Sequence, residues 1–357
     1  MELGSEFELN ISELERVDDT IFNYLSKYNS IYTSNGRNAA KLLNRLLPSG
    51  KILLPSYICQ SVIDVYKEKF TIEYYHVKKN FDIDLEDLHS KLCQDVAVVY
   101  LMHYFGKIQN QHILEFLSSM REKYDFLIIE DTTHSVFTCP NTIGDYCICS
   151  LRKWFPISDG GVVYSKRELF GIDAKALHQR IAYGKLDAMI LKYSQIHRNV
   201  KCNDTYREIF QLEEEKLENE QEILGISCMS RMILNCISVK KMTMVRKRNL
   251  QYLRDGLGKT HIEIPIDEEY GVPLALPIYI NNRDDFRSYL IQNQIYCAVH
   301  WPVEDEALRN NKALTEMISH IISLPLDQRY DEEHLDYMLS IIAKYFDVHQ
   351  NRQEGNV

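Results

Sequence analysis

Features of membrane and secreted proteins are missing from this sequence. No apolar run reaches the ~18 residues that a membrane-spanning helix needs. The N-terminus also lacks the apolar core of a secretory signal peptide. We therefore expect a cytoplasmic protein that works without a membrane.

Positive charge is also scarce. The chain has 41 Lys and Arg against 51 Asp and Glu, a formal net charge of -10 over 357 residues. Because nucleic acids are bound by basic faces, this balance argues against nucleic acid as the main partner. A negatively charged substrate would have to meet positive charge gathered locally. The length allows one large or two moderate domains with an ample core.

The sequence lacks the cysteine and glycine patterns of several common sites. Its nine cysteines have no disulfide-type rhythm, which indicates reduced thiols in a cytosolic protein. Cys147 and Cys149 point to one side of a predicted strand, but no second Cys or His pair has ligand spacing, so we expect no metal site. Neither G-x-G-x-x-G nor G-x-x-x-x-G-K-[ST] follows a predicted strand, which disfavours a nicotinamide or P-loop enzyme.

What the sequence does contain is an alternation of strand and helix signals. Strands that are apolar on both faces are predicted at 52–55, 71–76, 96–101 and 126–129, with helices between them. This pattern predicts a mainly parallel sheet covered by helices on both sides, an α/β fold. Ligands of such sheets bind beyond the carboxyl ends of the strands.

The stretch from Leu127 to Gly161 gathers the residues with the most chemistry. Its first strand ends in Glu130 and Asp131, and a later strand leads to Lys153 and a Gly-Gly pair. Taken singly, such an acid is usually a helix cap and such a lysine is usually solvated. Together they match pyridoxal phosphate (PLP), which needs a lysine for covalent attachment and a carboxylate on its pyridine nitrogen.

A second candidate lies in the turn that precedes the predicted helix 39–47. Ser34, Asn35 and Gly36 come directly before that helix, where free backbone N–H groups and the helix dipole favour an anion. The alternative is an ordinary N-cap. A phosphate group is therefore one ligand that this turn suits.

The order E-D-T-T-H…G-D-Y-C-I-C-S-L-R-K…D-G-G-V-V-Y-S resembles the DegT/StrS-type (DegT/DnrJ/StrS) aminotransferases. These are fold-type-I PLP enzymes that mostly aminate keto groups of nucleotide-linked sugars. The resemblance covers about residues 31 to 347. It implies that Asp131 binds the pyridine nitrogen, that His134 lies by the ring hydroxyl and that Lys153 holds the cofactor covalently. The family's serine lies five residues before the lysine, whereas Ser150 lies three before Lys153.

The resemblance also implies the remaining cofactor contacts. Gly36 and Arg37, with Asn38 beside them, match the family's phosphate-binding turn. Cys59 aligns best with the residue that covers one face of the ring, and Tyr57 is nearby. The other implied cofactor contacts are His103, from a stretch comparable to the family's H-x-x-G, and Ser150.

On the substrate side, His300 matches a family landmark near the substrate mouth, and Trp154 and Arg231 are further candidates. Sugar-nucleotide members carry a Y-N-x-R loop that reaches into the partner subunit's site, but the comparable residues here are Ile226 to Arg231. The family implies a homodimer with a shared active site.

The resulting hypothesis is an aminotransferase that moves an amino group from an amino acid, by family default L-glutamate, to a keto group of a nucleotide-linked sugar. Such an activity would serve amino-sugar or surface-polysaccharide biosynthesis. Two alternatives stay open: a PLP enzyme acting on a non-nucleotide ketone or amino compound, and a catalytically silent binding protein of the same fold. The family's dehydratases have histidine at the lysine position, so Lys153 excludes that relative.

For the domains, we expect a large PLP-binding domain over 10–240 and a small α+β domain over 241–347. Residues 1–9 read like a cloning-site linker, and residues 348–357 are expected to be a disordered tail.

Overall fold

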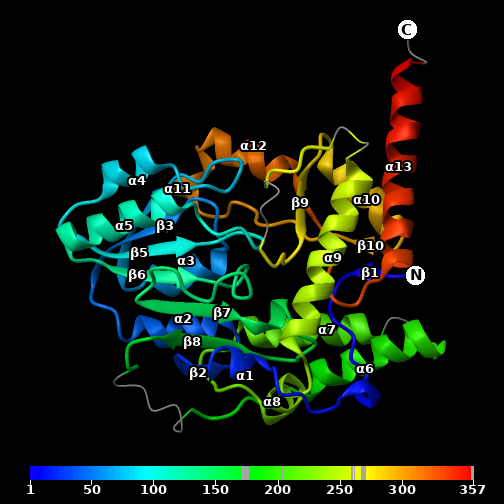
Figure 1. The fold of residues 1–357 in the computed structure, drawn as a ribbon, viewed down its shortest axis with the longest axis horizontal. Coiled ribbons are helices and arrows are strands. Elements are labelled where there is room, and N and C mark those ends of the chain that lie inside the picture. The colour runs from blue at the N-terminus through cyan, green and yellow to red at the C-terminus, as the bar shows by residue number, and fades with distance from the viewer. Residues whose placement is uncertain (170–176, 203–204, 259, 261, 267–270, 355–357) are drawn as a thin grey trace.

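The computed structural model describes the whole chain except residues 170–176, 203–204, 259, 261, 267–270 and 355–357, and leaves out the side chains of 348–354. A seven-stranded sheet forms its centre, in the order β2-β8-β7-β6-β5-β3-β4 (Figure 1). Of the strands of this sheet, only β8 runs in the direction opposite to the others. The strands are β2 (Asn29–Thr33), β3 (Gly50–Pro55), β4 (Phe70–Tyr75), β5 (Val96–Met102), β6 (Leu127–Asp131), β7 (Tyr146–Ser150) and β8 (Gly161–Ser165).

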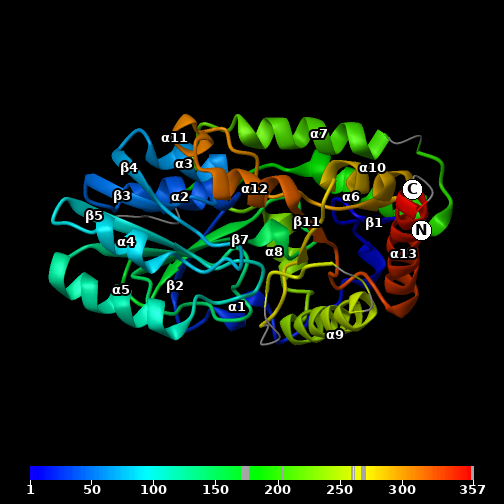
Figure 2. The same ribbon diagram turned by 90° about the horizontal axis from the view of Figure 1, so that it is seen from above.

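Helices cover both faces of this sheet. Figure 2 shows α2 and α3 on one side and α5 on the other. The inner strand β5 is almost entirely buried because both of its faces are covered. The predicted mainly parallel, helix-covered sheet is therefore confirmed. The helices over the sheet are α2 (Gly36–Asn44), α3 (Gln60–Tyr66), α4 (Leu85–Lys91) and α5 (Gln111–Tyr124).

The register of the strands brings the candidate residues to one edge. Met102 at the end of β5 pairs with Asp131 at the end of β6, and Asp131 pairs with Ile148 of β7. Ser150, the last residue of β7, pairs with Gly161, the first of β8. The carboxyl ends of β5, β6 and β7 therefore meet where the chain also turns into the short helix η2 (Leu151–Lys153).

The chain from α9 onward builds a separate hydrophobic cluster beside the sheet. Arg246 of α9 donates to the carbonyls of Pro273 and Leu274, and Asn249, three residues later, donates to the carbonyl of Leu326. These two side chains anchor α9 to the loops around it. The elements are α9 (Val239–Leu257), β9 (Leu276–Tyr279), α10 (Arg283–Gln292), β10 (Ile295–Tyr296), α11 (Glu306–Arg309), α12 (Lys312–His320), β11 (Ile321–Leu324) and α13 (Glu332–Glu354).

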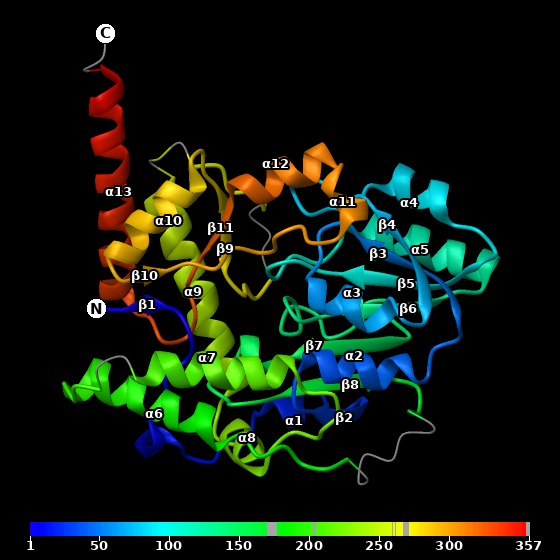
Figure 3. The ribbon, with the colours of Figure 1, turned by 180° about the vertical axis from the view of Figure 1, so that it is seen from behind.

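The structure describes most of both chain ends. The tail after Asp347 continues α13 as far as Glu354, and residues 355–357 lie outside the described part. At the other end, β1 (Leu3–Gly4) pairs in parallel with β10 (Figure 3), and the Leu3 side chain is fully buried. Residues 1–9 are thus part of the fold, because they fill an apolar site and supply carboxylates to buried cations.

Those cations lie on α6 (Tyr183–Arg198) and on the loop between β11 and α13. The buried Lys192 lies 3.1 Å from Glu2 and 3.5 Å from Glu8, and Arg329 donates to Glu8 at 2.9 Å. Lys192 belongs to α6, which packs on α7 (Thr205–Glu218). Within the described residues, no helix is long and apolar enough to cross a membrane.

Removing residues 1–9 is expected to lower the free energy of unfolding by about 3 kcal/mol or more, because Lys192 and Arg329 would lose buried partners. Denaturant unfolding measures this change. Glu316→Gln is the matched control, since it breaks an exposed ion pair with Lys79 and should cost less than about 1 kcal/mol. Equal stability of the truncated and full chains would show that the segment contributes nothing to the fold.

Candidate active site

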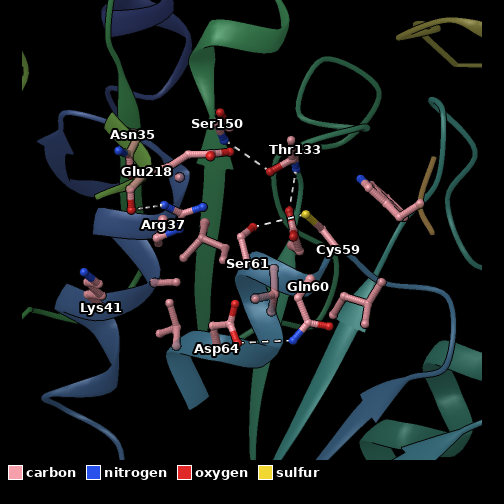
Figure 4. A pocket seen from close by; sticks show the side chains of 18 of the residues that line it. Asn35, Arg37, Lys41, Cys59, Gln60, Ser61, Asp64, Thr133, Ser150 and Glu218 are labelled. Atoms are coloured by element: carbon pink, nitrogen blue, oxygen red, sulfur yellow. Dashed lines mark hydrogen bonds between the residues drawn. The ribbon is translucent and has the colours of Figure 1, made fainter. Parts of the chain in front are cut away.

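A cavity of about 820 Å³ lies at the carboxyl ends of β6 and β7 (Figure 4). The N-terminus of α2, the start of α3 and η2 form its walls. Of the predicted catalytic and cofactor-binding residues, the cavity is lined by Gly36, Arg37, Cys59, Asp131, His134, Ser150 and Lys153. The topology therefore gathers residues that lie more than a hundred positions apart in the sequence.

Asp131 ends β6 with its carboxylate buried at the cavity wall. Its Oδ2 accepts a hydrogen bond from the Tyr100 hydroxyl at 2.7 Å, and its Oδ1 accepts one from the Thr133 N–H at 2.8 Å. Burial raises the pKa of Asp131, and these two hydrogen bonds only partly oppose that rise. A cationic ligand group beside the carboxylate would stabilise its ionised form.

Lys153, the last residue of η2, extends an exposed side chain into the cavity. Within the part of the chain that the structure describes, its amine has no hydrogen bond or ion pair. By contrast, the neighbouring Arg152 is held by Glu214 of α7. The amine is thus available for a bond to a ligand.

His134 lies in the cavity wall as a buried, uncharged imidazole. Its ring stacks on Trp301, with centroids 5.5 Å apart and an interplanar angle of 24°. Burial, reinforced by His300 and Lys153, lowers the pKa of His134 well below its usual value. Its Nδ1 is buried and has no partner among the described residues. A buried polar atom in that state is suited to a hydrogen bond from a bound ligand.

The N-terminus of α2 forms the second end of the cavity. Asn35 caps the helix by accepting the Asn38 N–H at 2.7 Å, while the first N–H groups of a helix have no partner within it. Ser150 lies against this end, since a Cβ placed on Gly36 would meet the Ser150 Cβ at 3.0 Å. Ser150 thus reaches the helix N-terminus although it lies only three residues before Lys153. This cradle of N–H groups and a hydroxyl suits a phosphate.

Gly161 is required because β8 begins directly beneath this cradle. A Cβ on Gly161 would lie 2.2 Å from the Asn35 carbonyl oxygen and 2.8 Å from the Gly36 nitrogen. Gly160 also donates its N–H to the Ser34 carbonyl at 2.6 Å. The glycine pair therefore allows the strand to approach the helix N-terminus, and any side chain would displace it.

Gly161→Ala is accordingly expected to weaken PLP binding about tenfold or more by moving the N–H groups of α2. Fluorescence titration of the apoprotein with PLP measures the affinity. Gly258→Ala serves as the control, because the added methyl would meet only carbonyl oxygens at 3.4 and 3.6 Å. If Gly161→Ala binds PLP like the original chain, the phosphate does not lie at this cradle.

Other predicted cofactor residues take different places. Cys59 is the N-cap of α3 and lines the cavity, but Tyr57 is buried outside it and donates to the His300 carbonyl at 2.5 Å. His103 is also buried outside the cavity, with Nε2 3.1 Å from Glu130 and Nδ1 accepting the Gln109 N–H at 3.0 Å. Asn38 uses its side chain to bind Ser34. Tyr57, His103 and Asn38 thus lie outside the lining of the cavity, and their contacts with the cofactor stay predictions.

The predicted substrate residues also lie outside the lining of this cavity. Trp154 is fully buried: its indole N–H donates to the Thr133 carbonyl at 2.7 Å, and the Arg246 guanidinium covers its ring at 4.7 Å. His300 lies edge-on to His134, with ring centroids 5.6 Å apart. Burial, and to a smaller extent the positive charge of Lys153, lowers the pKa of His300 to about 3. Arg231, on α8 (Cys228–Leu234), covers the Tyr32 ring at 5.3 Å.

Thr133 is a site residue that the sequence did not reveal. Besides the bond to Asp131, its hydroxyl accepts the Ser150 N–H at 3.2 Å (Figure 4). Its carbonyl accepts the Trp154 indole N–H. One residue thus fixes the distance between the acidic end of β6 and the loop of Lys153. Its position two residues after Asp131 was the available signal, since a Thr can hydrogen-bond backbone groups nearby.

A second unpredicted part of the site is the wall formed by α7. Arg37 donates to the Glu218 carbonyl at 2.8 Å (Figure 4). Lys41 donates to that of Glu220 at 3.0 Å, and Arg152 pairs with Glu214. These three cavity cations are therefore occupied by α7 or by the loop that follows it.

The fold defined here is that of fold-type-I PLP-dependent aminotransferases. No family model and no curated protein matches the sequence. The structure is nonetheless similar to solved structures along nearly its whole length. PseC of Helicobacter pylori, an aminotransferase involved in the biosynthesis of pseudoaminic acid, gives a TM-score of 0.68 at 14% identity over 98% of this chain and 100% of that one.

Two further solved structures are similar to this fold. The aminotransferase TlmJ from Streptoalloteichus hindustanus gives a TM-score of 0.68 at 13% identity over 98% of this chain and 100% of that one. A DegT DnrJ EryC1 StrS aminotransferase from Brucella abortus gives 0.60 at 15% identity, covering 91% and 88%. The resemblance drawn from the motifs is thus confirmed at the level of the fold.

Proposed function

We propose that this chain is a PLP-dependent aminotransferase that transfers an amino group from an amino acid to the keto group of a sugar. One observation carries the proposal: a single cavity combines the buried carboxylate of Asp131, the unpaired amine of Lys153 and the helix N-terminus beside Ser150. These are the three anchors that the ring nitrogen, the aldehyde and the phosphate of PLP require.

The residues present fit the cofactor. The Asp131 carboxylate lies in a buried site that a protonated ring nitrogen would stabilise, and the unpartnered Nδ1 of His134 leaves one hydrogen bond to be made. When bound, PLP accepts the electron pair that remains when a proton leaves the substrate carbon. Asp131 would keep the ring nitrogen protonated, which makes the ring a better electron acceptor.

Lys153 has two successive roles in this proposal. Its amine would hold the cofactor covalently. When free, the same amine would take the proton from the α-carbon of the donor and later give a proton back, acting as general base and then as general acid. Its exposure in the cavity and its lack of a partner are suited to both roles.

The finer parts of the proposal follow the resemblance. We infer L-glutamate as the donor, a nucleotide-linked keto sugar as the acceptor, and a role in amino-sugar or surface-polysaccharide biosynthesis. We also infer a cytoplasmic homodimer with a shared active site. The sugar chemistry is supported by the fold shared with PseC, and the cytoplasmic setting by the nine free cysteines.

The test is the visible spectrum of the purified protein loaded with PLP, before and after L-glutamate is added. The expected result is a band of lysine-bound PLP that disappears with the donor and gives the spectrum of pyridoxamine phosphate. Borohydride reduction before the donor is added should attach the cofactor to the peptide containing Lys153. Absence of a band in intact protein would refute the roles of Asp131 and Lys153, and a band that ignores every amino donor would refute amino transfer.

The acceptor needs a separate measurement. Keto sugars with and without a nucleotide are offered to the amine-loaded form, and the return of the first band reports amino transfer. Preference for the nucleotide-linked ketones would support the acceptor inferred above. Reaction with the free ketones alone would assign the chain to the non-nucleotide alternative.

A further inference from the structure

Tyr100 lies behind the candidate site and makes one contact with it. Its side chain is fully buried in β5, outside the cavity lining, and its hydroxyl is 2.7 Å from Oδ2 of Asp131. The register explains the contact, because Met102 pairs with Asp131, and Tyr100 lies two residues earlier on the same face of the same strand. This hydrogen bond thus joins neighbouring strands within the sheet.

The surroundings hold the Tyr100 ring in place. The ring meets that of Tyr66 edge-on, with centroids 5.8 Å apart at 68°. Burial raises the pKa of the Tyr100 phenol well above its usual value, so the group remains protonated and acts as a donor. The Tyr100 hydroxyl on β5 therefore always donates its hydrogen bond to the Asp131 carboxylate on β6.

The carboxylate of Asp131 accepts one hydrogen bond on each of its two oxygens. Tyr100 binds Oδ2 and the Thr133 N–H binds Oδ1, so rotation of the carboxylate is restricted. Each oxygen of an ionised carboxylate has a further lone pair for a ligand. The other ionisable groups that act on Asp131 are His103, which is hydrogen-bonded to Glu130, and the buried side chains of Tyr66, Tyr104 and Cys149.

We propose that Tyr100 is a positioning residue of this site, whose hydroxyl orients the Asp131 carboxylate toward the ring nitrogen of PLP and keeps it ionised. The inference rests on the proposed function, because it assigns a ligand to Asp131. In a buried site without a cation beside it, a carboxylate that lost this donor would tend to be protonated. A protonated acid could not pair with a protonated ring nitrogen.

The test compares Tyr100→Phe with Tyr75→Phe. Both variants remove one buried hydroxyl from a strand of the same sheet. Only the Tyr100 hydroxyl contacts Asp131, whereas the Tyr75 hydroxyl donates to the main-chain carbonyl of Tyr100. The first readout is the pKa of Asp131 in the apoprotein, measured by NMR of carboxyl-labelled aspartate. We expect this pKa to rise in Tyr100→Phe and to stay unchanged in Tyr75→Phe.

The second readout uses the loaded protein. Tyr100→Phe should lower kcat by roughly tenfold to a hundredfold with little change in the KM of the donor, as expected for the loss of a hydrogen bond to a charged group. Added to Asp131→Asn, the same substitution should have little further effect, because the two residues act as one unit. Tyr75→Phe should retain most of the activity.

These outcomes separate the two proposals. If the original chain binds no PLP, the proposed function fails, while the NMR titration still tests whether Tyr100 keeps Asp131 ionised. If Tyr100→Phe and Tyr75→Phe give the same pKa of Asp131, or if Tyr100→Phe lowers kcat equally with and without Asp131→Asn, Tyr100 only packs the sheet and the inference is wrong.

Discussion

Lys153→Ala is expected to abolish amino transfer while leaving the fold intact. The substitution removes the one amine in the described part of the cavity that no protein group engages, so covalent attachment of PLP and proton transfer are lost together. We expect turnover to fall on the order of 10⁴-fold or more. Because the side chain is exposed and unpaired, the free energy of unfolding should change by less than about 1 kcal/mol. Steady-state assays and denaturant unfolding measure the two effects.

Two controls sharpen this result. Lys153→Arg keeps the positive charge but removes the reactive amine, so it should be as inactive as the alanine variant. Lys67→Ala removes another lysine of the cavity wall, which is paired with Asp64 at the surface, and should retain most of the activity. Turnover by Lys153→Ala at a substantial fraction of the original rate would overturn the central assignment.

Asp131→Asn is expected to reduce kcat on the order of 10³-fold. At ~3 Å and an effective dielectric constant of ~20, the attraction between the carboxylate and a protonated ring nitrogen is about 5 kcal/mol before desolvation is subtracted. An amide keeps the size but carries no charge. Its single oxygen can accept the Thr133 N–H, and its NH2 group can donate to the Tyr100 hydroxyl in place of the bond that the carboxylate accepts. The loss should therefore fall on kcat more than on the fold.

Stability provides the control for this variant. Burial raises the pKa of Asp131, which means that the apoprotein spends free energy to keep this carboxylate ionised. The neutral amide avoids that cost, so the apo form of Asp131→Asn should be at least as stable as the original chain. Calorimetry and PLP titration would show a stable protein that still binds the cofactor. A kcat within tenfold of the original would mean that Asp131 does not serve the ring nitrogen.

The sequence was sufficient to predict those features of the fold and the site that depend on a local residue pattern. The apolar run that forms β5 predicts a strand covered on both faces, and the structure confirms it. Asp131 and Lys153 follow predicted strands, and the rule that ligands bind at strand ends was enough to place them together. The sequence contains the Gly160–Gly161 pair, but only the structure shows that Gly161 lies against the backbone of Asn35.

The remaining features depend on register and packing, which the sequence does not specify. Tyr100 lies within an apolar run, and only the pairing of β5 with β6 shows that it meets Asp131. His103 follows the same strand, yet its bond with Glu130 holds it outside the cavity. Trp154 is next to Lys153 in the chain, but its side chain is turned into the core beneath Arg246. Lys153 and Trp154 are thus neighbours in the sequence, but one side chain lines the cavity and the other is buried in the core.

The place of β2 at the edge of the sheet has a consequence for how the protein is made. β2 leads directly into the N-terminus of α2, yet its neighbour in the described sheet is β8, which is synthesised far downstream, and its Thr33 also bridges to Gly225. A contact of such high sequence separation carries a large loop-closure cost and forms slowly. We expect the anion cradle to be completed after the inner strands, so the ability to capture the cofactor would be acquired late in folding, on the ribosome as well as during refolding.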